Sequence, residues 1–224
     1  MIQVGIVGSG FIGPAHIEAL RRLGFVEVVA LCDASLELAQ EKALQLNIPH
    51  AYDDVDALLA HPGLQVVHNC TPNFLHAEVN RQILRAGKHV FSEKPLCMTS
   101  EEARELVKMA QEAGVVHGVS FVYRQFAMVQ QAASMMRDGS AGRLFSAYGG
   151  YHQDWMLLEN DFNWRVDAQQ GGVSRTVADI GSHWCDTVQF VTGRRIVEVM
   201  ADLAIVWPTR KASLGAQATF SEQP

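Results

Sequence analysis

The sequence predicts an α/β protein in which a parallel sheet, covered by helices on both faces, is followed by a second region of α+β character. Short apolar runs alternate with amphipathic segments through the first 122 residues, and the pattern then changes. Alternation at this spacing is typical of parallel strands joined by helices. The hydrophobic fraction of 48% over 224 residues is enough to form a sizeable core.

The elements of the first region follow from apolar periodicity and from capping residues. Five buried strands are predicted at 2–8, 25–32, 66–70, 88–92 and 115–121. Helices are predicted at 12–23, 36–46, 72–87 and 100–113, with a short one ending at 59. Ser35 is a good N-cap, Thr99 and Glu102 have the spacing of a capping box, and Gly24 and Gly114 follow helices as C-terminal stops.

The second region has fewer and less regular elements. Helices are predicted at 126–138 and 176–192, and strands at 143–151 and 196–207, with a polar, aromatic-rich stretch at 152–175. The change of pattern places a boundary near residue 122. We therefore predict two domains, 1–122 and 123–224.

Charge and cysteine content exclude several classes of protein. A net charge of −6 gives no electrostatic footprint for nucleic acid or for an anionic membrane. No apolar run reaches the roughly 18 residues that a membrane-spanning helix needs. The four cysteines contain no C-x-x-C pair and indicate neither a disulfide framework nor a zinc site. We expect no nucleic-acid or membrane partner, no metal, and a reducing, cytoplasmic location.

A G-x-G-x-x-G turn, made by Gly8, Gly10 and Gly13, lies between a predicted strand and a predicted helix. Asp33 follows 20 residues after Gly13, at the end of the next predicted strand. Such glycines allow a tight turn, close approach of a pyrophosphate and close helix packing, while the aspartate accepts hydrogen bonds from a ribose. The alternative is a strand–helix turn without a ligand. Because no Arg or Lys lies between Asp33 and Lys42, nothing neutralises a 2′-phosphate, so we expect NAD as cofactor rather than NADP.

Two further polar segments, TPNFLH at 71–76 and EKP at 93–95, each follow a predicted strand. Taken singly, the first is a good helix start and the second a common surface pair. In a doubly wound sheet the carboxyl ends of the strands converge on the ligand crevice, so together the two segments indicate a binding site.

Four segments resemble the glucose–fructose oxidoreductase / inositol dehydrogenase / rhizopine-catabolism (Gfo/Idh/MocA) family: GIVGSGFIG at 5–13, TPNFLHAE at 71–78, AGKHVFSEKPL at 86–96 and ADIGSHWCD at 178–186. The resemblance covers nearly the whole chain. It implies a Rossmann domain, a second domain with a large open sheet, a sugar or cyclitol substrate, and association into a homo-oligomer. By resemblance, the dinucleotide would contact Gly8, Gly10, Phe11, Ile12, Asp33, Thr71, Asn73, His76, Glu93 and Lys94, with Trp164 and Arg165 near its nicotinamide end.

The chain departs from the family pattern in two ways. Ser120 stands where relatives often carry Asn, which puts a cofactor contact there in doubt. Relatives also continue well past the point where this chain stops, so we expect the second-domain sheet to be truncated at the C-terminus.

The chemistry of alcohol oxidation suggests the catalytic residues. Asp179 and His183 are spaced i, i+4 on a predicted helix and share a face, so the carboxylate can orient an imidazole that acts as general base or acid. Lys94 is a fixed positive charge that can polarise the reacting oxygen. A surface Asp–His contact and a plain surface lysine are the alternatives. Tyr123 and Arg124 are candidates for substrate contact or for domain packing.

Asp154 forms an H-x-D pair with His152, but no third metal ligand follows at suitable spacing, so we expect it in the substrate pocket or in loop structure. The predicted function is an NAD-dependent oxidoreductase acting on a secondary alcohol or ketone of a sugar, a cyclitol or a derivative. The alternatives are an NAD-using glycoside hydrolase of the same fold and a non-catalytic sugar or dinucleotide sensor.

Overall fold

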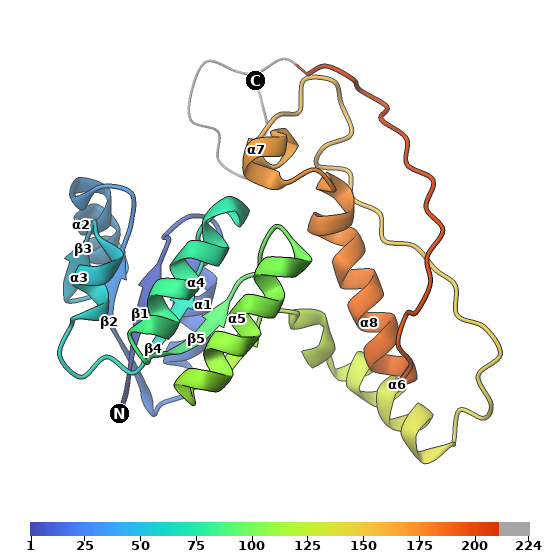
Figure 1. Ribbon diagram of the computed structural model, residues 1–224, viewed down its shortest axis with the longest axis horizontal. Coiled ribbons are helices and arrows are strands. Elements are labelled where there is room, and N and C mark those ends of the chain that lie inside the picture. Colours follow the sequence, from blue (N-terminus) through green and yellow to red (C-terminus); the bar gives the residue numbers. More distant parts are fainter. Residues whose placement is uncertain (211–224) are drawn as a thin grey trace. The chain divides into compact units, whose positions relative to one another are not determined.

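The computed structural model describes residues 1–210 and divides the chain into two compact units, the first Met1–Ser120 and the second starting at Phe121 (Figure 1). The strands of the first unit are β1 (Ile2–Val7), β2 (Val26–Cys32), β3 (His50–Tyr52), β4 (Val66–Asn69), β5 (His89–Ser92) and β6 (His117–Val119). Its helices are α1 (Gly13–Arg21), α2 (Leu36–Gln45), α3 (Val55–Leu59), η1 (Asn73–Leu75), α4 (His76–Arg85) and α5 (Ser100–Ala113).

The six strands form one sheet in the order β3-β2-β1-β4-β5-β6, and every neighbouring pair is parallel. The predicted fold class of this region is confirmed. The order reverses between β1 and β4, and ligands bind at such a switch point in sheets of this kind. The sequence analysis did not predict β3, because three residues are too short a run to show a period.

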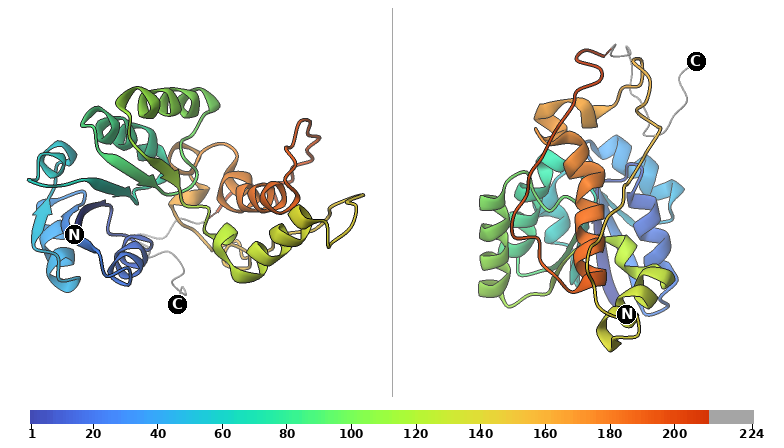
Figure 2. Two further views of the ribbon diagram at one scale, coloured as in Figure 1. Left: turned by 90° about the horizontal axis from the view of Figure 1, so that it is seen from below. Right: turned by 90° about the vertical axis from the view of Figure 1, so that its right-hand side faces the viewer.

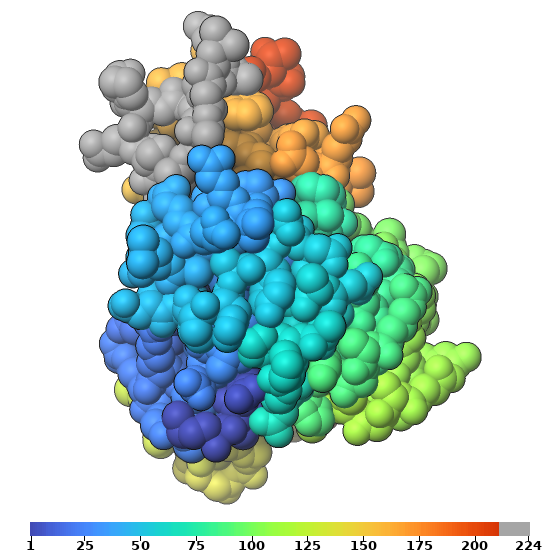
Figure 3. Space-filling model, turned by 90° about the vertical axis from the view of Figure 1, so that its left-hand side faces the viewer, coloured from blue at the N-terminus to red at the C-terminus, as the bar shows by residue number. Residues whose placement is uncertain are grey.

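Helices cover both faces of the sheet and form two apolar clusters. One cluster brings α1 and α2 against the sheet through Ile17, Leu20, Ala43, Val4, Ile6 and Leu31. The other brings α3, α4 and α5 against the opposite face through Leu58, Leu59, Ile83, Leu84, Leu106, Val67 and Val90. The left view of Figure 2 shows α4 and α5 (green) and α1 (blue) on opposite sides of the strands. Figure 3 shows the face that carries α2 and α3, in light blue and cyan.

The second unit contains η2 (Val122–Gln125), α6 (Ala127–Asp138), η3 (Trp164–Val166), α7 (Ala168–Gly171), the π-helical turn η4 (Val177–Gly181) and α8 (Ser182–Thr192). Helices α6 and α8 pack side by side (Figure 1). They end at Gly139 and Gly193, whose φ angles of 80° and 66° lie in the left-handed region that favours glycine. Both predicted helices are confirmed, although the first turn of the second is π-helical.

The strands predicted at 143–151 and 196–207 are wrong for the described residues, because no strand is found among residues 121–210. Most side chains in these segments are exposed to solvent, and Tyr148 at 95% and Met200 at 100% are nearly fully so. A strand is stabilised by ladder hydrogen bonds to a neighbour, and an apolar pattern alone does not provide one. Residues 211–224 of the predicted second domain lie outside the described residues.

No helix among residues 1–210 is both long enough and apolar enough to cross a lipid bilayer.

Candidate active site

The glycine turn after β1 has two positions where packing within the protein requires glycine and a third where a side chain would have room. Gly8 has a φ of +93°, and a Cβ there would lie 2.7 Å from the Cys70 carbonyl oxygen. A Cβ on Gly13 would collide with the Gly8 carbonyl oxygen. A Cβ on Gly10 would meet nothing within 4 Å. The absence of a side chain at Gly10 therefore leaves open space beside the turn rather than relieving a contact within the protein.

Helix α1 begins at this turn without a side-chain cap. Ile12 is its N-cap residue, and the first turn contains no acidic residue. The amide groups at a helix N-terminus carry partial positive charge and bind anions well. Phe11, in the same turn, is 61% exposed. Open space beside an uncapped helix start is the arrangement that a pyrophosphate needs, so the residues present fit a dinucleotide.

Asp33 is held in place at the end of β2. Its Oδ2 accepts hydrogen bonds from the Ser9 backbone N–H at 2.8 Å and from the Ser9 hydroxyl, and its Oδ1 accepts from the Ala34 N–H at 2.7 Å. These contacts fix the carboxylate against the glycine turn. The structure thus brings Asp33 and the turn together, as the motif predicts.

The ends of β4 and β5 are joined by a buried chain of hydrogen bonds. Asn69, at the end of β4, accepts from the Thr71 hydroxyl at 2.6 Å and donates to Asn80 Oδ1 at 2.9 Å. Asn80, on α4, donates to Ser92 Oγ at 3.0 Å at the end of β5. Asn73, in η1, is also buried. This chain fixes where the Thr71 loop leaves the sheet.

His76 links the same two loops and is only 1% exposed. Its Nδ1 lies 2.5 Å from the Pro95 carbonyl oxygen, and its Nε2 lies 2.7 Å from the Thr71 carbonyl oxygen. Burial lowers the pKa of His76, although the two carbonyl contacts oppose the shift. The ring lies between the loops, where it holds Thr71 and the backbone next to Lys94 in register.

Glu93 is buried beside Lys94 and receives hydrogen bonds from three directions. His16 Nε2 lies 3.0 Å from its Oε1, the Lys94 backbone N–H donates to its Oε2 at 3.1 Å, and Ser120 supplies a side-chain hydrogen bond. Burial raises the pKa of Glu93, but these hydrogen bonds outweigh burial and leave the pKa below its usual value. Ser120, whose departure from the family pattern is noted above, therefore contacts Glu93.

In the second unit, His183 lies among aromatic rings. Its ring centroid is 4.5 Å from that of Tyr123, 5.9 Å from that of Phe121 and 6.3 Å from that of Tyr151. The Tyr123 and Tyr151 hydroxyls are hydrogen-bonded at 2.5 Å. Burial, the Tyr151 hydroxyl and Asp179 raise the pKa of Tyr123 to about 12. The phenol therefore stays protonated at neutral pH.

Asp179 lies in the π-helical turn η4, directly before α8, and is 9% exposed. Its Oδ1 is 3.5 Å from Arg165 Nε, and its Oδ2 is 3.4 Å from Arg175 Nη1. Burial lowers the pKa of Arg175, and Asp179 partly offsets this. Arg165 also lies over the Trp164 ring at 4.4 Å. The structure thus brings three predicted residues together, Asp179, Trp164 and Arg165.

Arg124 and Asp154 are placed differently from those residues. Arg124 forms a two-pronged ion pair with Asp186 on α8, in which its Nε donates to Oδ2 at 2.7 Å, and it lies 5.4 Å from the centre of the Phe190 ring. These contacts support the packing interpretation of Arg124. Asp154 is exposed, and its carbonyl oxygen accepts from the Leu157 N–H at 2.9 Å.

Sequence reasoning missed several polar residues that shape both units: Asn69, Asn80, Ser92, His68 and Arg175. Asn69 could have been found, because it ends an otherwise apolar buried strand and a buried amide needs partners. Arg175 stands four residues before Asp179, a spacing at which a helix brings opposite charges together, so this pair could also have been found.

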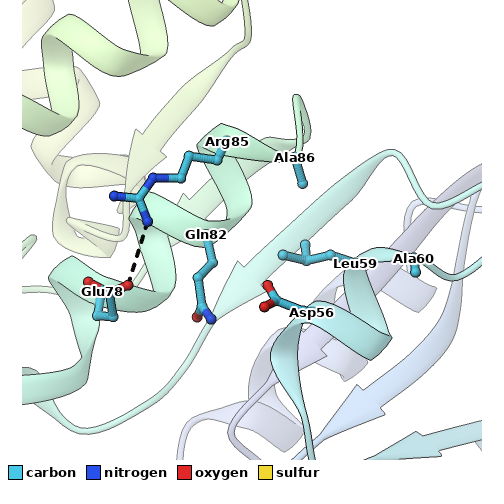
Figure 4. Close-up of a pocket in the computed structure, with 7 residues that line it drawn as sticks. All are labelled: Asp56, Leu59, Ala60, Glu78, Gln82, Arg85 and Ala86. Carbon is cyan, nitrogen blue, oxygen red and sulfur yellow. Dashed lines mark ion pairs between the residues drawn. The ribbon is translucent and has the colours of Figure 1, made fainter.

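A surface pocket lies between α3 and α4 in the first unit (Figure 4). Asp56, Leu59 and Ala60 line it from α3 and its end, and Glu78, Gln82, Arg85 and Ala86 line it from α4 and its end, with Arg85 3.8 Å from Glu78. None of the predicted site residues lines this pocket.

Comparison with known proteins decides the family. Residues 2–121 match the model of a family described as "Oxidoreductase family, NAD-binding Rossmann fold". The chain belongs to the GFO/IDH/MocA oxidoreductase family. Residues 129–221 match the GFO/IDH/MocA C-terminal domain. The resemblance noted in the four sequence segments is confirmed.

Several relatives in the GFO/IDH/MocA family have established names. Levoglucosan dehydrogenase of Pseudarthrobacter phenanthrenivorans is 33% identical over 201 residues, which cover 86% of this chain and 51% of the relative. 1,5-Anhydro-D-fructose reductase of Ensifer adhaerens is 32% identical, covering 90% of this chain and 60% of the relative. The solved structure of levoglucosan dehydrogenase in complex with NADH and levoglucosan is similar with a TM-score of 0.82 at 31% identity, covering 86% of this chain and 54% of that one. The chain thus spans about half the length of these proteins.

Proposed function

We propose that this chain belongs to an NAD-dependent oxidoreductase that transfers a hydride between a nicotinamide cofactor and a secondary alcohol or ketone of a sugar, a cyclitol or a derivative. The observation that carries the proposal is the glycine turn, where open space at Gly10, an uncapped α1 and a fixed Asp33 fit a dinucleotide. The sugar-linked names of the relatives support the substrate class. In this proposal residues 1–122 bind the cofactor and residues 123–224 form the substrate domain.

The first unit would hold the dinucleotide through groups at the carboxyl ends of its strands. Gly8, Gly10, Phe11 and Ile12 would surround the pyrophosphate, and Asp33 would accept hydrogen bonds from the adenosine ribose. The nicotinamide end would be formed by Thr71, Asn73, His76, Glu93 and Lys94. By the resemblance to the family, Trp164 and Arg165 are also proposed as cofactor contacts. The bound cofactor supplies a carbon that accepts or returns a hydride.

The catalytic roles follow from charge and proton-transfer capacity. Lys94 would polarise the reacting oxygen, and His183 would take the hydroxyl proton as the alcohol is oxidised. Asp179 would orient His183, and its carboxylate oxygens lie 3.5 Å from Arg165 Nε and 3.4 Å from Arg175 Nη1. Tyr123, in contact with the His183 ring, is a candidate for substrate contact, whereas we propose only a loop role for the exposed Asp154.

A substrate panel tests this function. The purified chain is incubated with NAD and each of a set of sugars, anhydrosugars and cyclitols, and reduced nicotinamide is followed by its absorbance. We expect turnover with at least one member, and loss of that turnover in Lys94→Ala. A chain that binds no dinucleotide in titration calorimetry would contradict the proposal at its first step.

The preference for NAD over NADP is tested separately. Because a 2′-phosphate would meet the Asp33 carboxylate, we expect NADP to bind more weakly by about 1–3 kcal/mol. Asp33→Ala should narrow this gap, and calorimetry with both dinucleotides measures it. Equal affinities in the unmodified chain would show that Asp33 does not select the cofactor.

Two further proposals concern assembly and location. The exposed apolar side chains of 143–151 and 196–207 support self-association into a homo-oligomer, which light scattering would detect and a monomer at high concentration would contradict. All four cysteines are free, which supports a reducing, cytoplasmic location.

A further inference from the structure

A buried cluster of titratable side chains lies beneath the Lys94 loop. It consists of His16 on α1, His68 on β4 and Glu93 after β5, each 8% exposed. His16 Nδ1 lies 2.9 Å from His68 Nδ1, and His16 Nε2 lies 3.0 Å from Glu93 Oε1. Phe91 covers both imidazoles, with ring centroids 5.9 Å from His16 and 5.1 Å from His68.

The direction of the His16–Glu93 hydrogen bond is fixed by chemistry. The carboxylate of Glu93 also accepts from Ser120 and from the Lys94 backbone N–H, and an ionised carboxylate can only accept. His16 Nε2 must therefore carry a proton and donate. Burial and the proximity of His16 lower the pKa of His68 to about 3, so His68 is neutral at pH 7. With the proton on Nε2, the Nδ1 of a neutral His16 can only accept, so His68 Nδ1 donates along the Nδ1–Nδ1 contact.

The hydrogen-bonded pair of His16 and Glu93 joins two parts of the proposed cofactor site that are far apart in the sequence. His16 belongs to the first turn of α1, and its backbone N–H donates to the Ile12 carbonyl oxygen at 3.1 Å. Glu93 accepts directly from the backbone N–H of Lys94. A displacement of the glycine turn would therefore be transmitted to Lys94 through two hydrogen bonds that meet at the Glu93 carboxylate.

Stability alone does not explain such a cluster. Replacing buried ionic groups by apolar side chains of similar volume is often neutral or stabilising, because apolar groups avoid the desolvation penalty. The Val, Leu and Ile side chains of the neighbouring cluster show that the fold packs this face of the sheet with apolar groups elsewhere. A donor is needed at this position only if Glu93 must remain charged and fixed.

We propose that His16 is a positioning residue: through Glu93 it couples the glycine turn to Lys94, so that dinucleotide bound at the turn fixes the Lys94 amine. The inference rests on the proposed function, because it takes the turn and Lys94 as parts of one cofactor site. It assigns a role to a residue that touches neither cofactor nor substrate.

The test compares His16→Leu with His16→Gln, two substitutions of similar volume of which only the glutamine keeps an N–H donor. The readout is acylation of lysine amines by an N-hydroxysuccinimide ester, with and without NADH, quantified by peptide mass spectrometry. Lys108, whose side chain is 75% exposed, is the internal reference. The exposed His117→Ala is the control variant. Thermal unfolding verifies that each variant is folded.

In the unmodified chain we expect NADH to slow acylation of Lys94 and not of Lys108. His16→Leu should retain its fold but lose the protection of Lys94, and His16→Gln should restore it. Where turnover is measurable, His16→Leu should lower it about 10-fold to 100-fold with a smaller change in KM, since a misplaced group costs rate more than binding. His117→Ala should match the unmodified chain.

Two outcomes overturn the inference. Full protection of Lys94 in His16→Leu would show that the pair does not position Lys94. Equal loss of the NADH protection of Lys94 in His16→Leu and His16→Gln would show that the imidazole ring, rather than its N–H donor, positions Lys94. If NADH fails to protect Lys94 in the unmodified chain although it binds, the proposed placement of the cofactor is wrong, and this result is distinct from both.

Discussion

The two units fix their functional side chains in different ways. In the first unit, Asp33, Thr71 and Glu93 follow parallel strands and are held by hydrogen bonds to neighbouring backbone or buried amides. In the second unit, His183 is surrounded by aromatic rings, and Asp179 is paired with two arginines. The difference teaches that the ends of parallel strands can position polar side chains through nearby backbone and side-chain hydrogen bonds. Polar side chains near α8 depend instead on contacts with other side chains. In the proposed function, most cofactor contacts come from the first unit and the proton-transfer group His183 comes from the second.

The largest expected effect separates these two roles. His183→Ala should lower turnover by about 10²–10⁴-fold, the usual range for losing a general acid or base, while NAD affinity remains near that of the unmodified chain. Lys94→Ala should lower turnover by a similar factor and also weaken NAD binding, because Lys94 belongs to the binding unit. Steady-state kinetics and calorimetry measure the two quantities. The division of roles would be broken if His183→Ala lost NAD affinity together with turnover.

The first unit could be predicted from the sequence because its signals are local. Five of its strands, the glycine turn and the capping box at Thr99 all appear within short windows, and the structure contains the capping box with both of its hydrogen bonds. The buried hydrogen-bond network around Asn69 and Asn80 could not be predicted in detail, since it joins residues from different elements. The pairing of Glu93 with His16 is likewise a tertiary contact across 77 positions.

The second unit was harder to predict for a physical reason. Its helices carry clear periodicity and end at glycines, and they were found. The segments 143–151 and 196–207 have the composition of strands, but a strand is completed by a partner, and the sequence pattern does not show whether one is present. The π-helical geometry of η4 and the ion pairs of Asp179 with Arg165 and Arg175 were not predicted. The pairing of Asp179 with His183, which helical spacing suggests, stays a prediction.

The next prediction sharpens the account of the first unit by separating folding from binding within one turn. Gly13→Ala should lower the free energy of unfolding by about 1–3 kcal/mol, because its Cβ collides with backbone. Gly10→Ala should leave stability unchanged or slightly higher, since its Cβ meets only open space. It should nevertheless weaken NAD binding about tenfold, or roughly 1.4 kcal/mol. Urea unfolding and calorimetry measure these effects, and unchanged NAD affinity in Gly10→Ala would place the pyrophosphate elsewhere.

A third prediction concerns acid. The pKa of His68 is lowered to about 3 in the folded chain, against about 6.5 in an unfolded one. Between these pH values the imidazole binds a proton in the unfolded chain but not in the folded chain. The free energy of unfolding is therefore highest above pH 6.5 and falls as the pH drops below 6.5. The slope for one such group is at most about 1.4 kcal/mol per pH unit.

Urea unfolding followed by circular dichroism at pH 7.5 and pH 5.5 measures this loss. His68→Gln removes the titrating group, so its free energy of unfolding should fall by about 1 kcal/mol less than that of the unmodified chain between pH 7.5 and pH 5.5. His117→Gln, at the exposed start of β6, serves as the control and should behave like the unmodified chain. Parallel pH dependence in all three proteins would show that His68 does not govern acid sensitivity.

The smallest expected effect concerns the second unit, and it tests whether side-chain pairs stabilise that unit. Arg124 bonds Asp186 through two nitrogens, but its side chain is 43% exposed, so solvent screening limits the gain to about 1 kcal/mol. All four tryptophans lie beyond residue 121, so their fluorescence in urea reports this unit alone. Arg124→Ala should lower its unfolding free energy by that amount. Arg143→Ala is the matched control, because Arg143 lies 5.3 Å from the centre of the exposed Phe145 ring, and its loss should change stability by less than about 0.5 kcal/mol. If both variants unfold like the unmodified chain, the ion pair with Asp186 contributes nothing measurable to the stability of this unit.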